Sequence, residues 1–162
     1  MIYDNSHIRR QDRTLDESRA VKILKDGEYG VLSLRTEDGN GAYGIPLSYV
    51  WDGGNSIYIH CAPVGKKIDC IDACCNVSFC VIGRTKVIPS QFTTAYESIV
   101  LKCSAHRSLH EAERMSALSL LLSKYCPDEK ARGITYAEKS FHRTEIIRLD
   151  IEKFSGKTKD KF

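Results

Sequence analysis

Two glycine-rich turns in the first half of the chain constrain its fold most. Residues 38–41 (Asp-Gly-Asn-Gly) separate segment 29–36 from segment 42–51, and residues 52–55 (Asp-Gly-Gly-Asn) separate the latter from segment 56–61. Asp-Gly and Asn-Gly are typical of the tight turns of β-hairpins. The flanking segments alternate apolar and polar residues, as half-buried strands do. Consecutive strands joined by such short turns pair antiparallel, so the sequence predicts an antiparallel meander.

Later segments add strands to this meander. Residues 76–84, 96–106 and 144–151 combine β-branched residues with alternation and are predicted as strands. Residues 85–93 are predicted as strand or extended loop, broken by Pro89.

Helices are expected between these strands. Thr14 with Glu17, and Ser108 with Glu111, have the spacing of capping boxes and predict two helix starts. The predicted helices span 14–26, 66–73 and 109–125, with a helical turn at 136–140, a polar arm at 1–13 and a solvated, lysine-rich tail at 156–162.

The predicted fold class is mainly β: an antiparallel sheet of about six strands with flanking helices, in a single domain of residues 1–162. Helices are too few for alternating parallel α/β units. Closure into a barrel would remove most open edges. Pro46 lacks the N–H that a strand pairing needs, so it is expected at a bulge or an unpaired edge.

Charge and cysteine content exclude several classes. The net charge of +3 and the scattered basic residues give no reason to expect a nucleic-acid partner. No apolar run is long enough for a membrane helix, and residues 1–12 hold no apolar signal core. The seven cysteines are odd in number and contain no Cys-x-x-Cys pair, so reduced thiols and a cytoplasmic location are expected, without a zinc site.

A candidate phosphate site lies in segment 56–72. The predicted strand 56–61 runs through a Pro-Val-Gly turn into Lys66 and Lys67, which open the next predicted helix. Free backbone N–H groups and two cations at one place suit a phosphate dianion. The alternative is a solvated lysine pair in a loop.

Residue sets for direct catalysis are absent from the sequence. It contains no Gly-x-Ser-x-Gly, His-Glu-x-x-His or Walker-type loop. His106 and His110 flank a predicted helix start and do not share a helix face, and Asp69 and Asp72 are expected to be solvated. A protein of this kind can take its chemistry from a cofactor.

Four short motifs give the chain a family resemblance. These are Arg-Arg-Gln-Asp-Arg at 9–13, Gly-Ile-Pro-Leu-Ser-Tyr at 44–49, Ile-His-Cys-Ala-Pro-Val-Gly-Lys-Lys-Ile-Asp at 59–69 and Tyr-Glu-Ser-Ile-Val at 96–100. In this order and spacing they resemble the pyridoxamine 5′-phosphate oxidase-like family of flavin-binding split β-barrels, and most of all its nitroimidazole-resistance branch. No clear counterpart of the vitamin B6 phosphate-binding residues follows Phe141, so that substrate is not expected.

The resemblance implies flavin mononucleotide (FMN) held at a homodimer interface. Lys66 and Lys67 would contact its phosphate, and His60, as the expected proton donor, would sit at the ring edge or by the ribityl chain. The other residues that the resemblance assigns to the cofactor are Pro46, Leu47, Ser48, Tyr49, Cys61 and Ser98. Without the resemblance, Pro46 reads equally well as an ordinary edge proline and Tyr49 as a core aromatic.

The expected function is therefore that of an FMN-dependent oxidoreductase that reduces a small acceptor, such as a nitroimidazole-type nitroaromatic. One alternative is a non-catalytic module that holds flavin or haem for storage, sensing or scavenging, with His106, His110 or His142 as the axial haem ligand. Related split barrels also bind a deazaflavin. Another alternative is a cofactor-free barrel that acts as an interaction protein.

Overall fold

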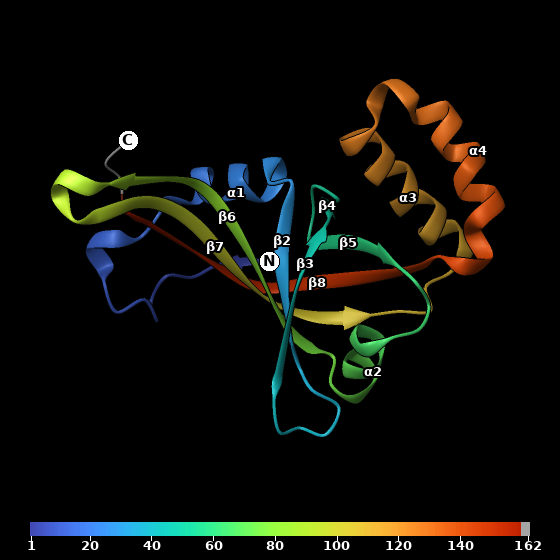
Figure 1. The fold of residues 1–162 in the computed structure, drawn as a ribbon, viewed down its shortest axis with the longest axis horizontal. Helices are drawn as coiled ribbons and strands as arrows, with labels where there is room; N and C mark the ends of the chain where they lie inside the picture. Colours follow the sequence, from blue (N-terminus) through green and yellow to red (C-terminus); the bar gives the residue numbers. More distant parts are fainter. Residues whose placement is uncertain (160–162) are drawn as a thin grey trace.

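One antiparallel sheet dominates the computed structural model, which describes residues 1–159 (Figure 1). The hydrogen-bonded strand order is β3-β2-β6-β7-β8-β5-β4, and β1 pairs in parallel with β8. The strands are β1 (Ile2–Tyr3), β2 (Tyr29–Arg35), β3 (Ala42–Ser48), β4 (Val50–Trp51), β5 (Ser56–Cys61), β6 (Asn76–Ile88), β7 (Thr93–His106) and β8 (Glu145–Lys159).

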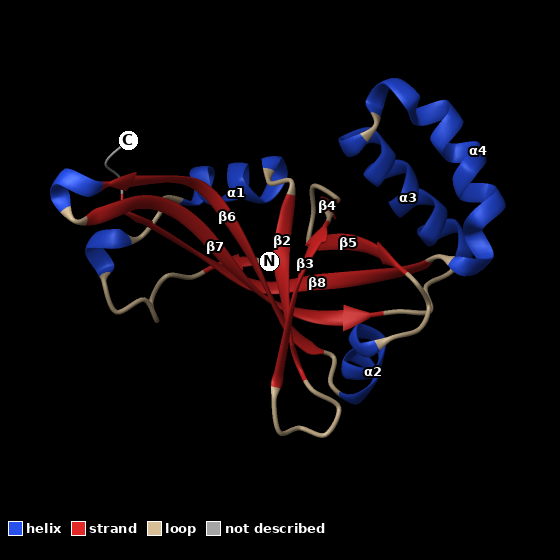
Figure 2. Ribbon diagram, viewed as in Figure 1, coloured by secondary structure: helices blue, strands red, loops and turns tan. Residues whose placement is uncertain are grey.

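Four α-helices flank this sheet (Figure 2). They are α1 (Glu17–Asp26), α2 (Lys66–Ala73), α3 (Glu111–Tyr125) and α4 (Lys130–Ser140), and short 3-10 turns lie at Gln11–Arg13, Pro89–Gln91, Pro127–Glu129 and Phe141–Arg143. Helices α3 and α4 form a hairpin that stands at one end of the sheet, whereas the long β6–β7 hairpin projects at the other (Figure 1).

The predicted fold class is confirmed: the chain is mainly β, antiparallel and flanked by helices. The sheet does not close through hydrogen bonds, since its path ends at β3 and at β4. It has eight strands rather than about six. The predicted strand 42–51 is interrupted at Tyr49 and forms both β3 and β4. Strand β1 was not predicted, because two residues are too few for an alternation pattern.

Buried and exposed residues alternate along β7, and the buried ones show which face of the sheet carries the core. Ile99, Leu101 and Cys103 are buried on one face, where they join Leu32 of β2 in the hydrophobic core. Helix α1 adds its buried residues to this core, so it covers that face of the sheet.

The edge position expected for Pro46 is confirmed. Strand β3 lies at the end of the strand order and pairs only with β2, where Pro46 is opposite Val31. The missing N–H of proline therefore costs the sheet no hydrogen bond on the free side.

Both predicted capping boxes were wrong. Helix α1 is capped by Asp16, whose carboxylate accepts the N–H of Arg19 at 2.9 Å, whereas Thr14 forms a bridge with Lys157. Helix α3 starts after His110, and Ser108 has a left-handed backbone with φ of 57°. The spacing of the motif could not identify either helix start. At α1 a neighbouring residue, Asp16, caps the helix, and at α3 the backbone before the helix is left-handed at Ser108.

The predictions of a solvated tail at 156–162 and of only a helical turn at 136–140 were also wrong. Residues 156–159 belong to β8, where Gly156 pairs with Ile99; residues 160–162 lie outside the described part. A Cβ on Gly156 would come within 2.7 Å of the Tyr3 hydroxyl and 2.9 Å of Leu15 Cβ, so close packing requires glycine there. Helix α4 spans Lys130–Ser140.

Candidate functional site

Helix α2 begins where β5 ends, as the sequence predicted. Its N-cap residue, Gly65, has φ of 123°, a conformation that favours glycine, and no atom lies within 4 Å of the position a Cβ would take. The Gly65 carbonyl accepts the N–H groups of Ile68 and Asp69. The N–H groups of Lys66 and Lys67, in the first turn, have no acceptor within the helix, so this end carries partial positive charge.

The two lysines have different surroundings. Both carboxylate oxygens of Glu37, in the β2–β3 turn, accept from Lys66 Nζ at 2.7 Å. Lys67 is instead half-buried beside the end of β5. Its positive charge helps to lower the pKa of the His60 imidazole. Burial raises the pKa of the Cys61 thiol, and the Lys67 charge partly offsets this rise. Because Lys66 is held by Glu37, Lys67 is the lysine that lies near the end of β5.

His60 borders a cavity of about 410 Å³ between the sheet edge and the α3–α4 hairpin. Burial is the larger cause that lowers the pKa of its imidazole, and the Lys67 charge is the smaller. The cavity is lined by Ser48, His60, Leu118, Leu121, Leu122, Tyr125, Cys126, Gly133, Tyr136, Ala137, Ser140 and Thr144. Gly133 allows the close approach of the two helices, because a Cβ there would lie 2.5 Å from Leu122 Cδ2.

The end of α3 is tied to the sheet next to this cavity. The N–H of Tyr49 donates to the Tyr125 hydroxyl at 3.0 Å, and Lys124 Nζ donates to the carbonyls of Gly27 and Tyr49 at 2.6 and 2.9 Å. Burial lowers the pKa of Lys124 to about 8. These bonds hold the helical hairpin against β3 and β4, so the cavity has a fixed wall.

Tyr49 is a core aromatic. Its ring is fully buried and meets the Phe79 ring edge-on, and its hydroxyl donates to the Leu24 carbonyl at 2.6 Å. Leu47 also packs toward the core, whereas Pro46 and Ser48 are exposed. Tyr49 therefore offers a ligand neither its ring, which is buried, nor its backbone, whose N–H and C=O bond Tyr125 and Lys124 of α3.

An apolar row crosses the outer face of the sheet. Paired residues lie on the same side, and the register joins Pro46, Val31, Cys80, Val100 and Ser155 across five strands. Val100 is 44% exposed.

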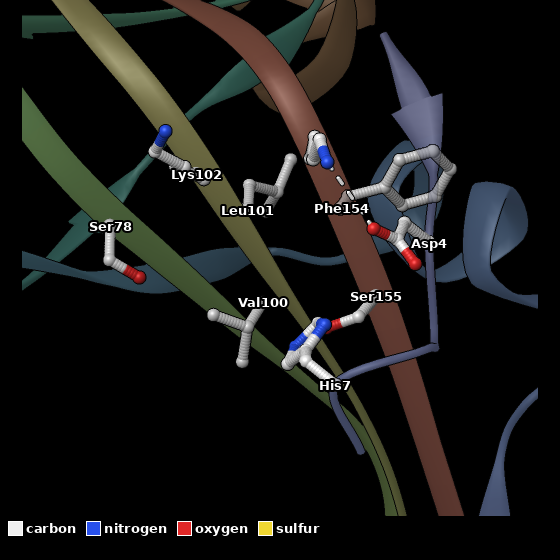
Figure 3. A pocket seen from close by; sticks show the side chains of 9 residues that line it. Asp4, His7, Ser78, Val100, Leu101, Lys102, Phe154 and Ser155 are labelled. Atoms are coloured by element: carbon white, nitrogen blue, oxygen red, sulfur yellow. Dashed lines mark hydrogen bonds and ion pairs between the residues drawn. The ribbon is translucent and has the colours of Figure 1, made fainter.

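A hollow of about 470 Å³ lies over the β8 end of this row. In Figure 3, His7 of the N-terminal arm lies beside Ser155, with Val100 next to it. The outer face therefore has room next to its apolar residues.

Ser98 belongs to this outer face and not to the lysine site. It pairs with Ile82 and Lys157, whereas the β6 segment that follows α2 starts at Asn76, opposite Ser104. The six residues from Ser98 to Ser104 span about 20 Å of strand. A single chain therefore brings together His60, Cys61 and Lys67, but leaves Ser98 apart.

A buried ion pair at Glu97, within the 96–100 motif, was not identified from the sequence. The Glu97 side chain, 5% exposed, faces the core side and pairs with Arg19 of α1 at 2.5 Å and with Arg84 of β6 at 3.2 Å. The Arg19 hydrogen bond is the main cause that lowers the pKa of Glu97 to about 2. A signal existed: Glu97 occupies a buried position in the alternation of 95–103, where an acidic residue needs a partner.

Other candidate groups are dispersed. Asp72 accepts from Arg107 at 2.5 Å, and His106 Nε2 lies 3.2 Å from Asp150. Neither His106, His110 nor His142 lines the cavity. Within residues 1–159, no cluster of three or more potential metal ligands occurs, and no helix has the length and hydropathy to span a membrane.

Comparisons with known proteins agree with this architecture. Residues 16–158 match the family model described as pyridoxamine 5′-phosphate oxidase. No curated protein matches the chain. A protein from Bacteroides thetaiotaomicron, described as a candidate 5-nitroimidazole antibiotic resistance protein, superposes with a TM-score of 0.76 at 18% identity, over 90% of this chain and 86% of that one.

Two further solved structures are similar. The flavocytochrome Anf3 from Azotobacter vinelandii has a TM-score of 0.78 at 18% identity, over 97% of this chain and 74% of the other. An FAD-binding protein from Mesorhizobium loti has a TM-score of 0.67 at 22% identity, over 91% and 98%. At these identities the likeness establishes the fold.

Proposed function

The chain belongs to the pyridoxamine 5′-phosphate oxidase family, and from this premise we propose that it is a cytoplasmic, homodimeric, FMN-dependent oxidoreductase. The observation that carries the proposal is the convergence of Lys67, the α2 N-terminus and His60 at the end of β5. The proposed phosphate site at the N-terminus of α2 thus lies next to His60, which lines the cavity under the α3–α4 hairpin. FMN has both a phosphate and a ring to occupy these two places.

The residues at α2 fit a phosphate group. The first-turn N–H groups of α2 and the ammonium of Lys67 are donors of the kind that phosphate binds. Gly65 leaves open the space that a side chain would fill. Lys66 is ion-paired with Glu37 and serves the site mainly through its backbone N–H.

The free edge of β3 suits the flavin ring. Pro46 and Ser48 are exposed there, and the backbone of Leu47 continues the same edge. Ser98 is remote within one chain, so on this proposal the contact comes from Ser98 of the partner subunit. The exposed apolar outer face supports a second copy, since Val100 and Ile82, 44% and 57% exposed, would be covered by it.

A charge placed on this outer face should separate the two copies. We expect Val100→Glu to change a dimer into a monomer in analytical ultracentrifugation, because an unpaired carboxylate would be buried in the interface. Ser123→Glu adds the same charge on the exposed surface of α3 and should leave the dimer intact. A Val100→Glu protein with wild-type mass would contradict this assignment of the interface.

When bound, FMN supplies transfer of a hydride equivalent from a reductant such as a nicotinamide to a small acceptor. Similarity to the 5-nitroimidazole resistance candidate favours a nitroaromatic acceptor. His60 borders the cavity and would deliver a proton or hydrogen bond to it. Because burial lowers the pKa of the imidazole, proton delivery should strengthen as the pH falls.

Stopped-flow mixing tests the reductase reaction. FMN-loaded protein, reduced anaerobically with one equivalent of dithionite, should regain its oxidised-flavin band on mixing with a nitroimidazole at least tenfold faster than free reduced FMN. Substitution His60→Gln should slow this step while FMN stays bound. Equal rates for protein-bound and free flavin would eliminate the reductase reaction.

Storage or sensing is the second candidate function. The similar structures include a flavocytochrome and an FAD- and haem-binding protein from Mycobacterium smegmatis, which favour cofactor binding without specifying turnover. Flavin retention combined with no acceleration of nitroimidazole reduction would support this candidate.

A further inference from the structure

The cavity beneath the α3–α4 hairpin has a lining without charged side chains. None of its twelve lining residues is Asp, Glu, Lys or Arg. Its apolar wall is supplied by Leu118, Leu121 and Leu122 from α3 and by Ala137 from α4, with the Tyr136 ring beside them. An ionic ligand would lose its hydration there without gaining a counter-charge.

Most polar groups of this lining already have protein partners. Ser140 Oγ donates to the Tyr136 carbonyl at 2.9 Å, Thr144 Oγ1 donates to the Ser140 carbonyl at 3.1 Å, and the Tyr125 hydroxyl donates to the Tyr49 carbonyl at 2.8 Å. Within residues 1–159 the His60 imidazole makes no hydrogen bond, although its backbone pairs with Ile146 of β8. The cavity therefore offers a ligand mainly apolar contacts, with few polar ones, among them the His60 imidazole and the Tyr136 hydroxyl.

Two residues connect the cavity with the proposed cofactor site. Ser48 ends β3, and His60 lies in β5 directly before the segment that leads to α2. Both belong to the set assigned to FMN and both line the cavity. A ligand in the cavity would therefore share a wall with the flavin ring.

We propose that this cavity is the binding site for the electron acceptor, and that it selects small uncharged aromatic molecules of one or two rings over anionic ones. The volume of about 410 Å³ lies in the range of ligand pockets. Acceptor selection rests on the proposed oxidoreductase function, but binding to the cavity does not require flavin.

Two isosteric probes test the proposal in the flavin-free protein. Isothermal titration should show 4-nitrobenzyl alcohol, which is neutral, binding at least tenfold more tightly than 4-nitrobenzoate, which is anionic. Ala137→Leu extends a buried side chain of α4 into the cavity and should weaken the neutral probe at least tenfold. Ala131→Leu makes the same change at an exposed position of α4 and should have no effect.

Leu118→Phe narrows the cavity from the half-buried face of α3 and provides a second test if Ala137→Leu does not fold. It too should weaken the neutral probe at least tenfold. Both cavity variants should retain FMN like the wild type. Equal affinity for the two probes, or unchanged affinity in a folded cavity variant, would overturn the cavity assignment. Failure of the wild type to bind FMN would overturn the proposed function and leave the probe result intact.

Discussion

Replacing Lys67 with alanine is expected to weaken FMN binding roughly tenfold to a hundredfold. A hydrogen bond to a charged group contributes about 1.5–3 kcal/mol, and each 1.4 kcal/mol is a factor of about ten in affinity. Lys67 is half-buried at the end of β5, where its ammonium has no carboxylate partner within the described chain. Fluorescence titration of FMN, whose emission changes on binding, measures the difference.

Lys66→Ala provides the matched control at the neighbouring position. Its ammonium is held by Glu37 in an exposed ion pair, so its removal should change FMN affinity less than about threefold. Lys67→Arg keeps the charge and should retain most of the affinity. A larger loss in Lys66→Ala than in Lys67→Ala would reverse the assignment of the phosphate-binding lysine.

Replacing Glu97 with glutamine is expected to cost about 2–3 kcal/mol of unfolding free energy at pH 7. Its carboxylate is nearly buried between Arg19 and Arg84, and its pKa falls from 4.5 to about 2. A shift of this size corresponds to about 3 kcal/mol. Both arginines retain some exposure, so water partly solvates them in the variant, and the cost is lower than for a fully buried pair.

The pH dependence follows from the direction of this shift. A carboxylate whose pKa is lowered in the folded state stabilises the fold above its unfolded pKa, and that stability declines as the pH falls from about 5 toward 2. Urea unfolding should therefore separate wild type from Glu97→Gln clearly at pH 7 and much less at pH 3. Glu152→Gln removes an exposed partner of Lys102 and should change stability by less than about 0.5 kcal/mol. A Glu97→Gln protein as stable as the wild type at pH 7 would show that the Arg19 contact is not stabilising.

Strong local patterns made most of the sheet predictable. Alternation and Asp-Gly turns identified β2, β3 and β5, and the edge position of Pro46 followed from its missing N–H. Helix α4 could not be predicted with equal ease, because it is polar and depends on packing against α3 at Gly133. Gly156 looked like part of a solvated tail, but its place in β8 depends on contacts with Tyr3 and Leu15, far away in the sequence.

The sequence indicated which segment carries the candidate site, but not how its side chains are arranged. The order of residues in 59–69 placed a phosphate site at the start of α2, yet it gave Lys66 and Lys67 equal roles. Only the folded chain pairs Lys66 with Glu37, a contact between residues 29 positions apart. Likewise, alternation could not show that Tyr49 is buried by α1 and α3, or that Ser98 is remote from the lysines.

FMN binding by the wild-type protein tests the proposed flavin site at α2 and β5, and it is the reference measurement for the Lys67 titration. The purified protein is mixed with FMN, desalted and measured by absorption spectroscopy. We expect retained flavin bands with about one FMN per chain, as a dimer with two equivalent sites requires. A folded protein that has no flavin bands after desalting would show that α2 and β5 do not form a flavin site.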